Sequence, residues 1–167
     1  MLNEKYKDLT FVFHSIKDYS ELTQDIIKKN KLNNCEVVSD NIIKSHILKK
    51  SVFAVSKSGT VSLEICNAKI PSIILYKMSL INFFIIKMLV KTKYANIINI
   101  AAKEEIIPEL LQFNCNPKKI FENVSNFLEN PEKINEQIKK TQLIINNFKT
   151  KKPSSLQAAT VLNRFLN

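Results

Sequence analysis

The sequence predicts an α/β fold: a Rossmann-like parallel sheet with helices on both faces, followed by C-terminal helices. Between residues 11 and 76, short apolar runs alternate with longer segments whose apolar residues lie three or four positions apart, as in parallel-sheet proteins. Hydrophobic residues make up 45% of the 167 residues, which is enough to bury one core. We therefore expect one domain over residues 1–150 and a C-terminal helix or tail over residues 151–167.

The first half of the chain predicts four strands separated by helices. Phe11–His14 is an apolar run after a charged start, and residues 71–76 are dense in isoleucine, as buried strands are. Asp18 and Asp40 each precede a helical pattern, and aspartate is suited to cap a helix N terminus. The predicted order is strand 11–14, helix 18–30, strand 35–38, helix 40–48, strand 51–55, helix 58–68 and strand 71–76.

After Tyr76 the pattern becomes mainly helical. Ser79 is suited to cap a helix that continues to residue 90, and Pro117 and Pro131 stand where proline favours the first position of a helix. Residues 94–99 predict a fifth strand. The other predicted helices cover residues 108–112, 118–129, 131–148 and 154–165.

The charge balance favours anionic partners without choosing among them. The formal net charge is +10, and a basic surface attracts nucleic acid, phosphorylated small molecules and anionic membranes alike. Arg164 is the only arginine, whereas sequence-specific nucleic-acid readers depend on bidentate arginine. We therefore expect no nucleic-acid partner.

The remaining composition predicts no metal site, disulfide or membrane span. Cys35, Cys66 and Cys115 are few and widely spaced, so neither a disulfide framework nor a metal motif follows and a reducing cytosol is expected. The longest apolar stretch, residues 70–90, is interrupted by Pro71 and by lysine and asparagine, which argues against a transmembrane helix.

The segment most informative about chemistry is residues 55–64, where a strand ends, the only glycine of the chain follows and a helix begins. Free N–H groups at a helix N terminus bind anions, and Gly59 lets the backbone approach a phosphate, with Ser58 and Thr60 as hydroxyl donors. Glu64 lies one turn beyond Thr60, where its carboxylate can accept hydrogen bonds from a ribose. This pattern suits a nucleoside diphosphate at the carboxyl ends of parallel strands. The alternative is a plain turn and cap, with Glu64 in solvent.

Further motifs extend this pattern from Phe53 to Gln112. They are Ser58-Gly-Thr-Val-Ser-Leu-Glu64, Ala68-Lys-Ile-Pro71, Tyr76-Lys-Met-Ser79, Lys87-Met-Leu-Val-Lys-Thr-Lys-Tyr94, Asn99 and Ile107-Pro-Glu-Leu-Leu-Gln112. Together they resemble the C-terminal half of the lipid-A-disaccharide synthases, which are inverting GT-B glycosyltransferases with two facing Rossmann-like domains. The strings at residues 89–94 and 108–112 are the most specific.

The resemblance implies a hexosyltransferase of lipid A, and hence lipopolysaccharide, biosynthesis. Family members transfer a diacylated glucosamine from its UDP carrier to a 2,3-diacylglucosamine 1-phosphate, and the C-terminal domain binds UDP. The resemblance implies no metal and no other cofactor. It implies UDP contacts from Ser58, Gly59, Thr60, Glu64, Lys77 and Asn99, with Tyr76, Glu109 and Gln112 close to the same pocket.

This chain departs from the family pattern at three positions and in extent. Ile98 and Leu80 stand where the family usually has proline, and Lys103 replaces a glycine, which would strain a loop that needs positive φ. The acceptor site, the catalytic base and a Gly-Ser-Arg motif of the family are not in the sequence. We therefore expect a fragment that needs its N-terminal domain in cis or as a separate chain, and we assign no catalytic residue.

Residues 79–91 predict an amphipathic helix with two open interpretations. Phe83 and Phe84 contribute to a broad apolar surface with Lys87 and Lys91 on one edge, and acylated substrates would bring such a helix to an anionic membrane. The implied location is peripheral, on the cytoplasmic side of the inner membrane. The alternative is a core helix packed on the sheet or on the N-terminal domain.

Two other functions compete with a donor-binding domain. A non-catalytic remnant of a split gene predicts neither binding nor activity and leaves apolar surface exposed. A small basic nucleic-acid-binding protein predicts salt-sensitive binding to any DNA or RNA. Selective UDP binding that Glu64→Ala weakens distinguishes the donor domain from both.

Overall fold

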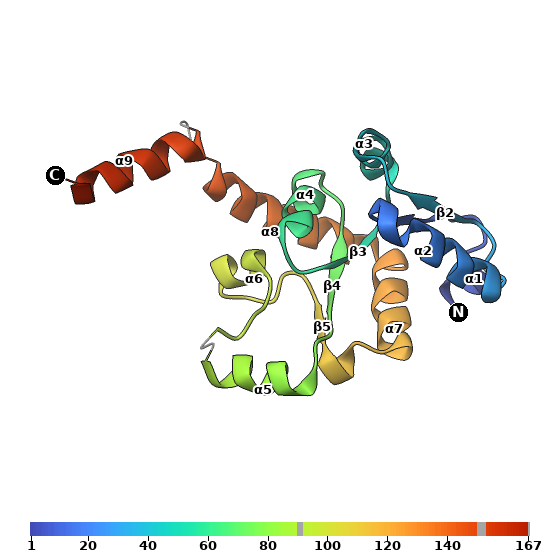
Figure 1. Cartoon of the computed structure of the whole chain (residues 1–167). Coiled ribbons are helices and arrows are strands. Elements are labelled where there is room, and N and C mark those ends of the chain that lie inside the picture. The colour runs from blue at the N-terminus through green and yellow to red at the C-terminus, as the bar shows by residue number, and fades with distance from the viewer. Residues whose placement is uncertain (90–91, 150–152, 167) are drawn as a thin grey trace.

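The strands of the protein form two parallel sheets. This computed structural model describes residues 1–89, 92–149 and 153–166. β1 (Phe11–His14) pairs with β2 (Cys35–Val38), while β3 (Ala54–Lys57), β4 (Ser72–Tyr76) and β5 (Glu109–Leu111) form a second sheet in that order. Every pairing is parallel, and helices flank the strands (Figure 1). The predicted α/β class is confirmed, although the strands divide between two sheets.

Helices connect and follow the strands. Asp40 caps α3 as predicted, because its carboxylate accepts hydrogen bonds from the N–H groups of Ile42 (2.7 Å) and Ile43 (2.9 Å). Asn116 caps α7 by accepting from the N–H of Lys119 at 3.0 Å. The helices are α1 (Leu2–Lys5), α2 (Lys17–Lys29), α3 (Asn41–Lys50), α4 (Thr60–Asn67), α5 (Leu80–Leu89), α6 (Ile97–Ala102), the 3₁₀ turn η1 (Gln112–Asn114), α7 (Pro117–Leu128), α8 (Pro131–Phe148) and α9 (Ser154–Leu166).

The strand predicted over residues 94–99 is wrong. The side chain of Asn96 accepts a hydrogen bond from the N–H of Ile98 at 2.9 Å and starts α6. An asparagine at this position therefore begins a helix inside an apolar run that would otherwise suit a strand. Asp18 was also predicted to cap a helix, but α2 begins after Ile16, which makes no side-chain cap bond.

The helix predicted over residues 108–112 is wrong as well. This segment forms β5 and continues into η1. Its pairing with β4 includes a 2.9 Å hydrogen bond from the N–H of Ile74 to the carbonyl oxygen of Pro108. Pairing with a strand distant in sequence thus overrides the local helical pattern.

The main core of the molecule lies on both faces of β4. Ile73 and Ile74 are consecutive residues whose side chains point to opposite faces, and both are 0% exposed. Ile74 packs with residues of α4, α6 and α8, whereas Ile73 packs with residues of β5 and α7. We call residues 53–148 the C-terminal core. Its buried clusters are Cys66, Ile74, Ile98, Ile107 and Ile145 on one face and Ile73, Leu110, Val124 and Phe127 on the other.

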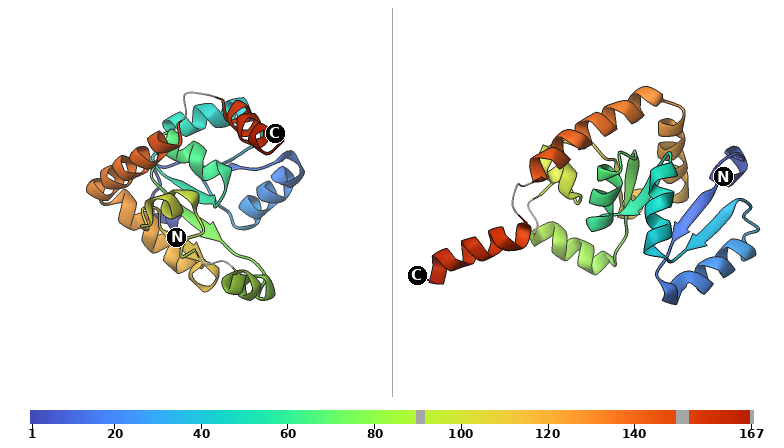
Figure 2. Two further views of the ribbon diagram at one scale, coloured as in Figure 1. Left: turned by 90° about the vertical axis from the view of Figure 1, so that its left-hand side faces the viewer. Right: turned by 90° about the horizontal axis from the view of Figure 1, so that it is seen from above.

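Residues 1–50, which we call the N-terminal unit, are packed much less tightly. Among the described residues, none before Ser62 is buried. The unit contacts the C-terminal core partly through α1, where Leu2 packs against the second cluster and the Tyr6 hydroxyl donates to the Glu129 carboxylate at 2.9 Å. Lys5 pairs with the same carboxylate. In Figure 1 the unit lies at one side of the core, and α9 extends away at the other, as the right-hand view of Figure 2 also shows.

Candidate functional site

The junction between β3 and α4 lies at the carboxyl end of the three-stranded sheet. Gly59 occupies the helix-cap position with φ 145° and ψ −161°, a backbone conformation that is essentially restricted to glycine. A Cβ atom here would meet no heavy atom within 4 Å beyond its chain neighbours in the described structure, so the backbone and not the available space requires glycine. In the first turn of α4, the N–H of Ser62 donates to the carbonyl oxygen of Gly59 at 3.1 Å. The first N–H groups of an α-helix, here those of Thr60 and Val61, have no acceptor within the helix and can meet an anion at its tip.

The two hydroxyl residues of this motif differ in their surroundings. The Ser58 hydroxyl donates to the carbonyl oxygen of Ala95 at 2.8 Å, which ties the junction to the segment before α6. Thr60 is exposed at the first position of α4. Thr60 is therefore accessible at the helix tip, whereas the Ser58 hydroxyl proton is already donated within the protein.

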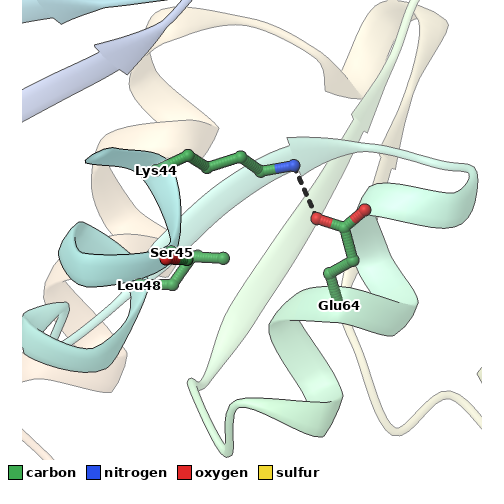
Figure 3. A pocket seen from close by; sticks show the side chains of 4 residues that line it. All are labelled: Lys44, Ser45, Leu48 and Glu64. Atoms are coloured by element: carbon green, nitrogen blue, oxygen red, sulfur yellow. Dashed lines mark hydrogen bonds and ion pairs between the residues drawn. The ribbon is translucent and has the colours of Figure 1, made fainter. Parts of the chain in front are cut away.

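Glu64 lies one turn beyond Thr60 on α4, as predicted, and has a partner on another helix. Its carboxylate accepts a hydrogen bond from Nζ of Lys44 on α3 at 2.5 Å, and Figure 3 shows the two side chains pointing toward one another. The Glu64 side chain is 49% exposed and that of Lys44 is 18% exposed. Together with Ser45 and Leu48 they line a pocket of about 300 Å³. The ion pair thus holds the carboxylate in place without burying it.

A buried polar network supports the junction from beneath. The side-chain amide of Asn96, 0% exposed, donates to the Ser62 hydroxyl at 2.9 Å, and that hydroxyl donates to the carbonyl oxygen of Gly59 at 2.6 Å. The Glu109 carboxylate accepts from the N–H groups of Ala95 (2.7 Å) and Asn96 (3.0 Å). The network therefore fixes the start of α4, the start of α6 and β5 relative to one another.

Asn99 belongs to this network and does not reach an open surface. It is 0% exposed, and its Oδ1 accepts from the N–H groups of Ile106 and Ile107, each at 2.9 Å. Its Nδ2 donates to the carbonyl oxygen of Ile107 and to Glu109, each at 2.7 Å. The oxygen and the nitrogen of this amide are thus both engaged within the protein, so Asn99 positions the loop after α6, and its predicted contact with UDP stays a prediction.

Gln112 holds the end of β4. It is 6% exposed, and its amide accepts from the N–H of Met78 at 2.9 Å and donates to the carbonyl oxygen of Met78 at 3.1 Å. Lys77, directly before Met78, is exposed at the carboxyl end of the sheet. Gln112 therefore fixes the backbone that carries Lys77, and it has a positive φ of 48° itself.

Lys57 and Lys44 belong to this region although the motif pattern does not mark them. Nζ of Lys57, the last residue of β3, lies 4.9 Å from the ring centroid of Tyr76, the last residue of β4. This cation–π contact lies at the same carboxyl end of the sheet as Gly59 and Lys77. The only sequence signal for Lys57 is its place before Ser58. Lys44 has none, because its contact with Glu64 joins two helices distant in sequence.

The histidines, acidic residues and cysteines of the described part of the chain form neither a candidate metal site nor a disulfide. No group of three or more His, Cys, Asp or Glu side chains in them is placed to hold a metal ion. Cys35, Cys66 and Cys115 are free thiols. Burial raises the pKa of the Cys66 thiol to about 11, so that thiol stays protonated and serves the core.

The predicted membrane-facing helix α5 exposes apolar side chains. Leu80, Ile81 and Met88 are 53%, 73% and 85% exposed, while Phe83 is partly buried. Within the described ranges, no helix combines the length and the apolar character that crossing a bilayer requires. The side chains of Phe84 and Lys87, and the whole of Lys91, lie outside the described residues.

Known proteins match the chain over nearly its whole length. The family model for lipid-A-disaccharide synthetase matches residues 1–162. The lipid-A-disaccharide synthase of Rickettsia typhi is 32% identical over 168 residues, which cover 99% of this chain and 44% of that protein. The synthase of Rickettsia felis is 41% identical over 116 residues, covering 68% and 30% respectively. That of Rickettsia conorii is 47% identical over 92 residues, covering 55% and 21%. The chain thus spans less than half the length of these curated relatives.

Proposed function

This chain belongs to the lipid-A-disaccharide synthetase family, and from that premise we propose that it forms the UDP-sugar-binding half of a lipid A glycosyltransferase. The complete enzyme would transfer a diacylated glucosamine from UDP to a 2,3-diacylglucosamine 1-phosphate. The observation that carries the proposal is the junction of β3 and α4, where free amides stand one turn before an accessible carboxylate. That spacing suits the diphosphate and the ribose of one nucleotide.

The diphosphate would bind at the tip of α4. The N–H groups of Thr60 and Val61 and the helix dipole supply fixed donors there, and the Thr60 hydroxyl adds another. Lys57 and Lys77 add positive charge at the same carboxyl end of the sheet. As the bond from the sugar to UDP breaks, negative charge collects on the departing diphosphate, and preorganised donors stabilise that charge. We propose no metal ion for this step.

The nucleoside would extend from the tip along α4. The Glu64 carboxylate has two oxygens, and Lys44 engages one of them, so the group is held ready to accept from ribose hydroxyls. Tyr76, backed by Lys57, would form a wall near the uracil. Asn99, Glu109 and Gln112 would act indirectly by holding the loops around this pocket.

Titration calorimetry with UDP tests this assignment. Glu64→Ala removes the acceptor for the ribose, and hydrogen bonds to a charged group contribute about 1.5–3 kcal/mol, so the dissociation constant should rise roughly tenfold or more. Lys44→Met should weaken binding less, because it frees the carboxylate without removing it. Glu21→Ala, an exposed glutamate on α2, serves as the matched control and should leave the affinity unchanged.

Equal affinities for UDP in the Glu64→Ala and Glu21→Ala proteins would contradict a ribose contact at Glu64. Tight binding of any DNA or RNA that falls steeply with salt would instead favour the nucleic-acid alternative. A well-folded protein that binds neither UDP nor nucleic acid would identify a non-catalytic remnant.

We also propose that α5 lies at an anionic membrane surface on the cytoplasmic side, where acylated substrates would meet the enzyme. The exposed apolar residues Leu80, Ile81 and Met88 support this role. Phe83→Asp combined with Phe84→Asp should reduce sedimentation of the protein with phosphatidylglycerol vesicles. Phe113→Asp, which alters a phenylalanine 76% exposed on η1, is the control. Unchanged sedimentation of the double variant would assign α5 to packing against protein.

A further inference from the structure

Four strands lie at sheet edges in the part of the chain that the structure describes, namely β1, β2, β3 and β5. β1 pairs only with β2, and β3 pairs only with β4, while β4 is paired on both sides. A single open α/β sheet has two edge strands, so four edge strands in one α/β fold are unusual. An open edge presents unpaired N–H and C=O groups that can take up another strand.

The strand order places the open edges of β1 and β3 on either side of one position in a doubly wound sheet, with β2 and β5 at the outer edges. In the common order 3-2-1-4-5-6, the first strand is central and the chain extends outward from it in both directions. β2 and β1 correspond to positions 3 and 2, and β3, β4 and β5 correspond to positions 4, 5 and 6. Position 1, between β1 and β3, has no strand among the described residues.

The backbone directions identify which groups face this position. The N–H groups of Phe11 and Ser15 point toward β2, where they donate to the carbonyl oxygens of Asn34 (2.7 Å) and Val38 (2.9 Å). Because successive N–H groups of a strand alternate in direction, the N–H groups of Val12 and His14 point away from β2. In β3 the N–H of Ala54 donates to the carbonyl oxygen of Pro71 at 2.9 Å. The N–H groups facing away from β4 are those of Val55 and Lys57.

Exposed apolar side chains accompany the open edges. Phe13 of β1 is 39% exposed and Val55 of β3 is 45% exposed, although such residues are usually buried in parallel sheets. The hydroxyl of Ser56, also in β3, is buried without a hydrogen-bond partner in the described structure. In and just before α2, which connects β1 and β2, the large hydrophobic residues more than half exposed are Ile16, Tyr19, Leu22 and Ile26.

We propose that the edges of β1 and β3 form a docking slot for one parallel β-strand from the N-terminal half of the synthase. The slot rests on the strand topology, whereas the identity of the donor rests on the proposed function. The relatives contain more than half of their length outside the region this chain matches, which is where such a strand would come from. Insertion would join the two sheets into one.

The slot defines the chemistry of its occupant. β1 and β3 are four residues each, so the inserted strand needs about four residues in extended conformation. It would lie between two strands and under helices, which requires apolar side chains on both faces. Its backbone would accept hydrogen bonds from Val12 and His14 on one side and from Val55 and Lys57 on the other.

Amide hydrogen exchange on a fusion protein tests this slot. The fusion places before Met1 the roughly 30 residues that precede the matched region in the Rickettsia typhi synthase, the length of a strand and its crossover helix. Exchange of the Val12, His14, Val55 and Lys57 amides should slow by at least about tenfold relative to the unfused chain. A fusion carrying the same residues in scrambled order is the control and should not protect them.

A proline variant separates strand insertion from general tightening. Val55→Pro removes an N–H that faces away from β4, so the unfused chain should keep its circular dichroism spectrum and melting temperature. In the fusion the same change should abolish the added protection at Val12 and His14, whereas Val55→Thr should retain it. Lys57→Pro, at the end of β3, repeats the test if Val55→Pro unfolds the chain.

The remaining outcomes each decide a different point. Fusion amides that exchange as in the unfused chain would overturn the slot. Protection that appears in the unfused chain as its concentration rises would identify a second copy as the occupant and overturn the choice of donor. UDP titration of the fusion keeps the two proposals separate, because protection without UDP binding supports the slot alone and UDP binding without protection supports the nucleotide site alone.

Discussion

The N-terminal unit and the C-terminal core both contain parallel strands joined by helices, but they differ in how many residues their sheets bury. β4 has a paired strand on each side and helices on each face, and Ile73 and Ile74 are completely buried. β1 has one paired neighbour, and no described residue of the N-terminal unit is buried. A two-stranded sheet is too narrow to shield the helices beside it, and such sheets are marginal on their own.

This difference also separates the two parts of the proposed nucleotide site. Gly59, Thr60 and Glu64 belong to the C-terminal core, where the network around Asn96 fixes them. Lys44, which holds the Glu64 carboxylate, belongs to the N-terminal unit. Any loosening of that unit would therefore reach Glu64, the proposed ribose contact, before it reaches the proposed phosphate site at Gly59 and Thr60.

Matched isoleucine truncations give the strongest test of this comparison. Ile74→Ala in β4 removes a residue that is 0% exposed and should lower the free energy of unfolding by about 2–5 kcal/mol. Ile26→Ala in α2, at 51% exposure, should lower it by less than about 1 kcal/mol. Urea denaturation followed by circular dichroism measures both. Similar losses would mean that the N-terminal unit is as tightly packed as the core.

Local patterns predicted many elements but could not predict which strands become neighbours. The bounds of β1, β2 and α8 follow from sequence, because apolar runs, turns and Pro131 mark them locally. β5 was predicted as a helix because its strand character comes from pairing with β4. The division into two sheets has no local signal either, since strand patterns identify strands and not their partners.

The candidate site divides in the same way. The spacing of Gly59, Thr60 and Glu64 is a property of one strand end and one helix, so the sequence predicts it directly. The burial of Asn99 could not be predicted, because it depends on contacts with residues 106–109, and these contacts are tertiary. Lys44 meets Glu64 only because the fold brings its side chain on α3 within reach of α4, a tertiary contact that no motif records.

Two lysines with positive φ allow a smaller test of the two regions. Lys103 ends α6 at φ 56° and ψ 23°, so the strain expected from the replaced family glycine is present in the C-terminal core. Lys103→Gly should raise the free energy of global unfolding by about 1 kcal/mol. Lys31, at φ 50° in the N-terminal unit, offers the matched change Lys31→Gly.

Lys31→Gly should leave the global transition nearly unchanged, because the N-terminal unit contributes little to it. Lys103→Ala controls for loss of the lysine side chain and should bring no gain, since alanine also avoids positive φ. Urea midpoints of the three variants measure these differences. Equal gains from Lys31→Gly and Lys103→Gly would show that both regions unfold as one unit.

Acid should loosen the N-terminal unit before the C-terminal core, and this change should be smaller than those expected from the isoleucine and lysine variants. The pKa of Glu129 lies below its ordinary value of 4.5 because Lys5 and then Tyr6 donate to its carboxylate. The pKa of Asp40 lies below 3.8 because the N–H of Ile43 and then that of Ile42 donate to it. A lowered folded-state pKa means that the stabilisation is complete above the ordinary value and is lost as pH falls through the lowered one. Both groups are exposed, so the change is modest.

Hydrogen exchange between pH 7 and pH 3, corrected for intrinsic rates, measures this loosening. The amides of Phe11 and Phe13, which face β2, should lose protection below about pH 4, whereas those of Ile73 and Ile74 should keep it. Glu129→Gln removes one titrating group and should flatten the pH dependence at β1, since the Lys5 ion pair is then absent at every pH. Equal losses of protection at β1 and β4 would mean that acid unfolds the whole chain. The contacts of Glu129 with Lys5 and Tyr6 would then not specifically stabilise the N-terminal unit.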